Sequence, residues 1–96
     1  MDINLLFLFK NLYLITETEE MFSIEKKITL NNVKGKTISF IPFSEKVLGL
    51  TLIGFKFPLN NYTLIQGSSI CMSNVAIEND CQVEYKDGKL IGIIVK

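Results

Sequence analysis

The sequence predicts an all-β fold, a small β-sandwich or barrel of about seven short antiparallel strands. Short runs rich in Val, Ile, Thr, Tyr and Phe recur along the chain, and clusters of Asn, Asp, Gly and Pro separate them. One run near the N-terminus alternates between apolar and polar side chains. An Asp-Gly pair stands between two further runs near the C-terminus, and such a pair is typical of a tight hairpin turn.

The first part of the chain, residues 1–20, is interpreted as an N-terminal apolar segment ahead of a single all-β domain at 21–96. Positions 4–15 are strongly apolar, but Lys10 interrupts them and the run is too short to span a bilayer. Acidic residues follow the run, unlike the cleavage region of a secretion signal. Three readings stay open: a packed helix or strand, an interfacial or oligomerising segment, and an extension ahead of a start at Met21.

The first strand of the domain is expected over residues 22–30, because apolar and polar side chains alternate there with a period of two. Lys26 falls on the apolar face, which indicates an edge or a strand end. A turn at 31–36 leads into a second strand at 37–41, and Pro42 ends that strand or marks it as an edge.

The longest apolar stretch of the domain is 47–57, and both of its faces are apolar. This composition predicts a central strand covered on both sides, with Gly49 and Gly54 marking bends or a bulge. Two shorter strands are expected at 62–66 and at 70–77.

The C-terminal residues 81–96 are expected to form a hairpin with Asp87 and Gly88 as its turn. In that register one face of the ribbon is wholly apolar, and three aliphatic residues point to the other face and need a cover. Either the N-terminal segment or a second copy of the chain could cover them, so a homo-oligomer is expected. The predicted interaction surface consists of Ile91, Ile93 and Val95.

Several catalytic chemistries lack their residues in this sequence. The chain contains no His, which excludes a Ser-His-Asp triad, a Cys-His pair and a histidine metal site. Cys71 and Cys81 are too few for a zinc site. They could form a disulfide if their strands are neighbours, and buried free thiols are the expectation otherwise. The sequence therefore predicts no enzyme, no catalytic residue, no metal and no cofactor.

Positive charge gathers in the middle of the chain although the formal net charge is zero. An alternative function is therefore the binding of nucleic acid or of a nucleotide-like anion. Aromatic residues in the same domain could include a stacking surface for bases, and they are Phe40, Phe43, Phe55, Phe57, Tyr62 and Tyr85. The candidate anion-binding residues are Lys26, Lys27, Lys34 and Lys36.

The main functional prediction is a small non-enzymatic binding module that acts on a protein partner. A phage or mobile-element accessory protein directed at a host protein would fit the size and composition. A cytoplasmic location without membrane association is expected, because the apolar N-terminal run has neither the flanks of a signal nor the length of an anchor.

Overall fold

The computed structural model describes residues 13–68 and 70–95, and these two ranges form nine β-strands. The strands are β1 (Tyr13–Ile15), β2 (Glu19–Ile24), β3 (Lys27–Leu30), β4 (Thr37–Pro42), β5 (Lys46–Ile53), β6 (Leu59–Ile65), β7 (Asn74–Val75), β8 (Cys81–Glu84) and β9 (Leu90–Val95). Within the described ranges there is no helix of the length and apolarity that crossing a membrane requires.

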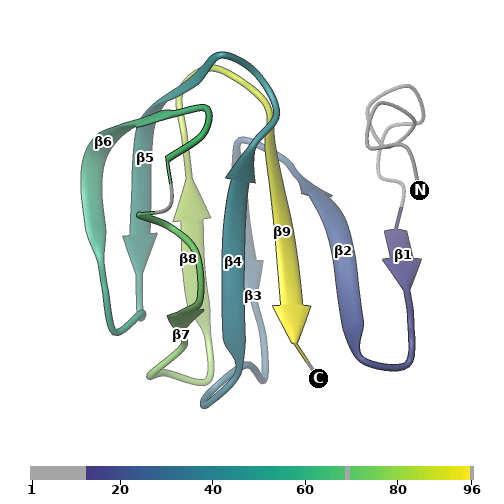
Figure 1. The fold of residues 1–96 in the computed structure, drawn as a ribbon. Coiled ribbons are helices and arrows are strands. Elements are labelled where there is room, and N and C mark those ends of the chain that lie inside the picture. Colours follow the sequence, from purple (N-terminus) through teal and green to yellow (C-terminus); the bar gives the residue numbers. More distant parts are fainter. Residues whose placement is uncertain (1–12, 69, 96) are drawn as a thin grey trace.

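Two antiparallel sheets pack face to face (Figure 1). One sheet has five strands in the order β1-β2-β9-β4-β7, and the other has four in the order β3-β8-β5-β6. Strand directions alternate in every described pair, as expected for a sheet with one face on the core and one toward solvent. The all-β prediction is confirmed, and of its two forms the sandwich is the one observed.

The described end of the N-terminal segment belongs to the five-stranded sheet. β1 pairs with β2, and β2 runs through position 20 to end at Ile24. Residues 1–12 lie outside the described residues, and most of the apolar run at 4–15 falls among them. The division of the chain at residue 20 stays a prediction.

The strand predicted over 22–30 is two strands that belong to different sheets. β2 pairs with β9, whereas β3 pairs with β8. The chain crosses between the sheets at Glu25 and Lys26, which are both exposed. Side chains of a strand alternate between its faces with a period of two, and the crossing uses two residues. The apolar positions of β2 and β3 therefore stay in phase, and the sequence pattern does not reveal the break.

The C-terminal strands lie where the sequence predicts them, but the predicted hairpin is wrong. β8 lies between β3 and β5 in one sheet, and β9 lies between β2 and β4 in the other. The Asp87-Gly88 bend therefore joins two sheets. Gly88 has a φ of 111°, and a Cβ there would lie 2.6 Å from the carbonyl oxygen of Lys46. Position 88 thus requires glycine for two reasons: the positive φ of its backbone and its close packing on β5.

β5 takes the central place predicted for the apolar stretch 47–57, since it pairs with β6 and with β8. Gly49 has a positive φ of 70°, and the register with β6 shifts between Val47 and Leu50, as expected for a bulge. The prediction of cover on both faces is wrong. One face enters the core, but Ile53 is exposed at the strand end.

The strand predicted over 70–77 is reduced to the two residues of β7, which pair with β4. Ser73 has a φ of 57° immediately before β7. A residue in the left-handed backbone conformation cannot continue an extended strand. The residues just before Ser73 therefore form a loop and not part of a strand.

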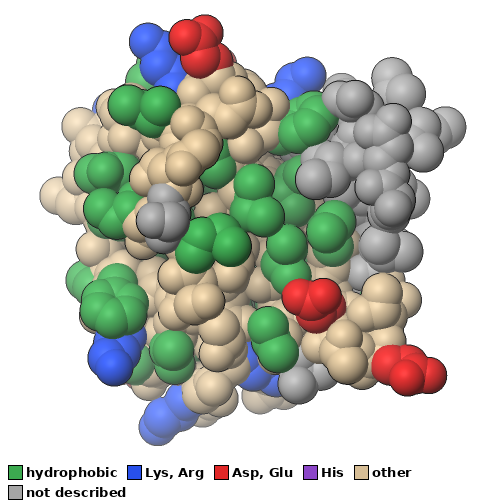
Figure 2. All heavy atoms as spheres, viewed as in Figure 1, with side chains coloured by type: hydrophobic (Ala, Val, Ile, Leu, Met, Phe, Trp, Pro, Cys, Tyr) green, Lys and Arg blue, Asp and Glu red, His purple; other side chains and the backbone are tan. Residues whose placement is uncertain are grey.

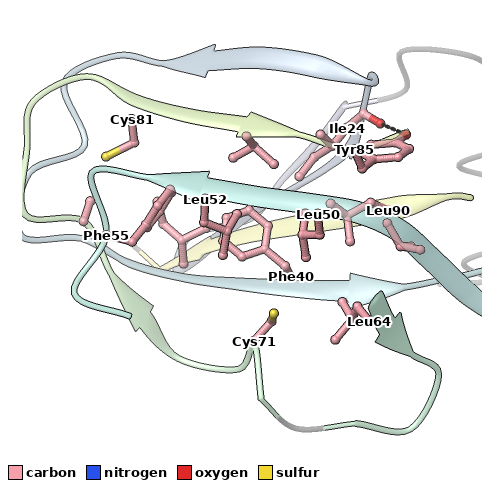
Figure 3. Close-up of a cluster of buried hydrophobic side chains, with 14 of the residues drawn as sticks. Ile24, Phe40, Leu50, Leu52, Phe55, Leu64, Cys71, Cys81, Tyr85 and Leu90 are labelled. Atoms are coloured by element: carbon pink, nitrogen blue, oxygen red, sulfur yellow. Dashed lines mark hydrogen bonds between the residues drawn. The ribbon is translucent and has the colours of Figure 1, made fainter. Parts of the chain in front are cut away.

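The core lies between the two sheets (Figure 3). Phe40 on β4 meets Phe55 edge to face, with ring centroids 5.5 Å apart. The Tyr85 hydroxyl donates a 2.6 Å hydrogen bond to the carbonyl oxygen of Ile24, which ties the end of β8 to β2. Cys71 and Cys81 are buried and free, so the prediction of buried thiols is confirmed.

Candidate functional site

The four predicted anion-binding lysines lie on either side of β3 along the chain. Lys26 and Lys27 stand at the start of β3, whereas Lys34 and Lys36 follow its end, and all four are exposed. β3 lies between the two pairs, with Lys27 at its first position and Lys34 and Lys36 beyond its last. A shared anion site on this face stays a prediction that the arrangement does not favour.

The predicted interaction surface lies on the outer face of β9, opposite the core residues Leu90 and Ile94. Exposure rises along the strand: Ile91 is buried, Ile93 is partly buried, and Val95 is 42% exposed. Figure 2 shows apolar side chains gathered across the middle of the same face of the molecule, with most charged side chains toward its margins.

A junction of two segments far apart in sequence lies beside β7, at the end of β5. Residues 54–57 and 74–77 are joined by backbone hydrogen bonds, and an isolated bridge pairs Phe55 with Ala76. The Lys56 N–H donates to the carbonyl oxygen of Val75, and the Ile77 N–H donates to that of Gly54, each at 2.8 Å. The backbone on both sides of the junction is therefore fixed.

The side chain of Asn74 completes this junction, although it is only 2% exposed. Its Oδ1 accepts hydrogen bonds from the N–H of Phe57 at 3.0 Å and from that of Val75 at 2.9 Å. Its Nδ2 donates to the carbonyl oxygen of Phe57 at 2.9 Å. A buried amide is stable only when its polar atoms are paired in this way.

The ring of Phe57 stands out from this fixed backbone and is 56% exposed. The Nζ of Lys56 lies 5.5 Å from the ring centroid, within range of a cation–π contact. Of the six aromatic residues that could stack on a ligand, Phe40, Phe55 and Tyr85 are buried, Phe43 and Tyr62 are partly buried, and Phe57 is exposed.

The segment that carries Phe57 also lines a recess of about 590 Å³. Its described lining is mostly apolar, and Glu78 is the charged residue among Thr51, Leu52, Ile53, Gly54, Phe55, Pro58, Leu59, Asn60, Ile77 and Glu78. This size and lining suit a small ring system, because apolar walls accept rings, and the exposed Glu78 carboxylate is the charged group of the described lining. Phe57 itself is not among the lining residues, whereas its neighbours Phe55 and Pro58 are. The candidate site is therefore the recess, with the exposed ring of Phe57 next to the segment that lines it.

A second groove of about 560 Å³ opens between β2 and β3. Apolar residues such as Ile28 line it together with Glu25 and Lys36, so it takes in one of the four predicted lysines. Opposite charges and polar side chains give this groove no single ligand preference.

Metal-binding groups and thiols were the reactive groups considered in the sequence. Among residues 13–68 and 70–95, no group of three or more His, Cys, Asp or Glu side chains could hold a metal ion. Burial raises the pKa of the Cys71 thiol to about 11, which keeps it protonated and poorly nucleophilic at neutral pH. The Cys81 thiol donates to the carbonyl oxygen of Gly54 at 3.2 Å.

The two-sheet fold and its recess define a β-sandwich domain with a pocket of small-molecule size. The family model described as "Thiamin pyrophosphokinase, vitamin B1 binding domain" matches residues 23–90. The chain therefore belongs to this domain family, and the matched range contains the junction, the recess and Phe57.

Relatives of the chain carry the same family name. A thiamine pyrophosphokinase of Bacillus subtilis is 50% identical over 56 residues, which cover 58% of this chain and 26% of that protein. The crystal structure of a B. subtilis thiamine pyrophosphokinase matches with a TM-score of 0.82 and 34% identity, over 90% of this chain and 41% of that one. The structure from Geobacillus thermodenitrificans gives a TM-score of 0.86 at 26% identity, over 98% and 46%. The chain thus spans less than half the length of these relatives.

These findings correct the functional prediction. The expectation of a non-enzymatic accessory module of the phage type is wrong, because the chain belongs to a domain family of an enzyme. The absence of His had favoured a protein without enzymatic activity. It excludes particular catalytic groups in this chain, but a substrate-binding domain of an enzyme need not contain any of them.

Sequence reasoning named Phe57 as one of several aromatic candidates and did not single out Asn74 or the recess. The available signal for Phe57 was Pro58 directly after it, because proline ends a strand and leaves its neighbour at a rim. Asn74 had no local signal for its contact with Phe57, since the two residues lie 17 positions apart.

Proposed function

We propose that this chain forms the thiamin-binding domain of a thiamin pyrophosphokinase, and that thiamin binds in the recess beside Phe57. The family match over residues 23–90 is the observation that carries the proposal. Thiamin joins an aminopyrimidine ring to a positively charged thiazolium ring. The apolar walls suit both rings and the Glu78 carboxylate attracts the charge. The exposed ring of Phe57 offers a stacking surface next to this segment, with Lys56 beside it.

The role proposed for the domain is to bind and orient the thiamin hydroxyl, which accepts the pyrophosphoryl group in such an enzyme. Because the chain spans 26% of the B. subtilis relative, the transfer reaction itself is proposed for the whole protein in which the domain works. The direct test of the domain is therefore binding rather than turnover.

Isothermal titration calorimetry of the full chain with thiamin tests this proposal. Phe57→Ala should weaken binding by about tenfold or more, because the ring loses its cation–π and stacking contacts. Ile65→Ala is the matched control, since Ile65 is equally exposed at the other end of β6. Absence of binding by the unaltered chain, or equal losses in both variants, would refute the site.

The proposed role of charge has a separate test. Thiochrome, a neutral compound derived from thiamin, should bind more weakly than thiamin to the unaltered chain. Glu78→Gln should reduce that preference, since the recess then lacks its carboxylate. An unchanged preference in the variant would show that Glu78 does not face the ligand.

We further propose that the chain self-associates through the outer face of the five-stranded sheet. The partly buried Ile93 and the exposed Val95 support this, as does the apolar centre of that face in Figure 2. Light scattering of the full chain tests it, and Val95→Lys should lower the average mass. A monomer at all concentrations would contradict the proposal.

The expected cytoplasmic location stays a proposal. It rests on the apolar N-terminal run, which Lys10 interrupts and acidic residues follow. Fractionation of cells that express the full chain tests it, and recovery from membranes alone would contradict it.

A further inference from the structure

We propose that Asn74 is a positioning residue of this site: its buried side chain fixes the backbone of Phe57 and so sets the direction of the exposed ring next to the segment that lines the recess. The inference rests on the proposed function, because it assigns a role within the same site. Asn74 acts through Phe57 and does not itself touch the ligand.

The hydrogen bonds of Asn74 reach the backbone of Phe57 on both sides of its Cα atom. One amide group accepts from the Phe57 N–H at 3.0 Å and donates to the Phe57 carbonyl at 2.9 Å. Two contacts to the same residue fix the orientation of its backbone as well as its position. The ring is more than half exposed, so the packing around it supplies little of this restraint.

Asn74 is itself held firmly on the five-stranded sheet. It pairs with Ile38 of β4, and the N–H of the preceding Ser73 donates to the Ser39 hydroxyl at 2.9 Å. The carbonyl oxygen of the following Val75 accepts from the Lys56 N–H. A continuous set of contacts therefore runs from β4 through Asn74 to Phe57.

The side chain of Asn74 has little capacity left for a ligand. A primary amide offers two acceptor sites on oxygen and two donors on nitrogen. Both acceptor sites and one donor are used within the junction, and the residue is 2% exposed. Because most of its polar atoms are already paired, the Asn74 side chain fits a positioning role and not direct contact with the ligand.

The test replaces Asn74 by Asp, which keeps the shape and the two acceptor contacts but loses the donor to the Phe57 carbonyl. At pH 8 we expect Asn74→Asp to weaken thiamin binding by about tenfold, the scale of one buried hydrogen bond. The Phe57 amide proton should exchange with solvent faster in the same variant, as measured by NMR. Asn31→Asp makes the same chemical change at an exposed position beside β3 and should alter neither quantity.

A lower pH should restore binding by Asn74→Asp, because a protonated carboxyl group can donate to the Phe57 carbonyl again. The charged residues on the segments around this position are Lys36, Lys56 and Glu78, and all three are exposed. The unaltered chain and Asn31→Asp, measured at the same pH values, account for titration of those residues and of thiamin. Recovery at low pH shows that the lost donor and the buried negative charge cause the defect, and the comparison in a Phe57→Ala chain then separates positioning from a general structural defect.

A double-mutant comparison tests directly whether Asn74 acts through Phe57. In a chain that already carries Phe57→Ala, Asn74→Asp should weaken thiamin binding no further, because the ring that Asn74 positions is absent. If Asn74→Asp does not fold, Asn74→Ser takes its place in the same comparison. Binding by the unaltered chain with an unchanged Kd in the variant overturns this inference alone. An unaltered chain that binds no thiamin overturns the proposed function and this inference with it.

Discussion

Replacement of Tyr85 by Phe removes one buried hydrogen bond and leaves the packing of the ring in place. Tyr85 is 8% exposed and belongs to the core cluster. Its hydroxyl donates to the carbonyl oxygen of Ile24 at 2.6 Å, across the boundary between the two sheets, as Figure 3 shows. The variant therefore measures how strongly this contact joins the sheets.

The expected cost follows from the burial of the acceptor. A typical protein hydrogen bond contributes about 1 kcal/mol, and a buried group left without its partner costs about 1–3 kcal/mol. Ile24 is 3% exposed, so water cannot replace the lost donor easily. We expect Tyr85→Phe to lower the free energy of unfolding by about 1–2 kcal/mol. For a domain of this size that corresponds to a fall in Tm of roughly 5–15 °C.

Urea unfolding and calorimetry measure this loss, with Tyr62→Phe as the control on a partly exposed tyrosine.

The pH dependence of stability gives a second test. Burial, and next the charge of Glu25, raise the pKa of Tyr85 above its ordinary value. Stability from this group is therefore complete below the unfolded pKa of about 10 and is lost as pH rises through the folded pKa. The deficit of Tyr85→Phe should shrink at such high pH. A Tm equal to that of the unaltered chain at pH 7 would refute the assignment of this hydrogen bond.

Two further predictions concern the backbone and the thiols. Gly88→Val should cost about 1–3 kcal/mol in thermal unfolding, because a β-branched residue is strained at positive φ. Gly67→Val is the control, since Gly67 has a φ of 86° and nothing lies within 4 Å of the new Cβ. If Gly88→Val costs no more stability than Gly67→Val, the close packing of Gly88 on Lys46 is contradicted. Cys71 should resist iodoacetamide at pH 8 in the folded chain, since burial raises its thiol pKa to about 11. Mass spectrometry should detect alkylation of Cys71 only in urea, and rapid reaction of the folded chain would contradict its burial.

Local patterns in the sequence predicted several strands, but they missed the break within 22–30, overextended the strand at 70–77 and did not predict how the strands pair. The strand expected at 37–41 is observed as β4, because β-branched residues and Pro42 act within a few positions. The pairing of β8 and β9 depends on contacts with distant strands. Gly92 held a usable signal, since a glycine inside a strand often marks a close approach. A Cβ there would lie 2.8 Å from the Phe22 ring, so Gly92 admits that ring against β9.

The candidate site shows why a strand pattern fails at a strand end. Phe55 and Phe57 are two positions apart, and in a continuous strand such residues share one face. The structure buries Phe55 at 2% exposure and leaves Phe57 at 56%. β5 ends at Ile53, Gly54 turns the backbone with a φ of 91°, and the pleat no longer sets the direction of either ring. Asn74 then binds the Phe57 backbone from a segment 17 positions away. The feature that presents the ring is therefore a long-range contact of a buried amide, and the residues around Phe57 do not encode it by themselves.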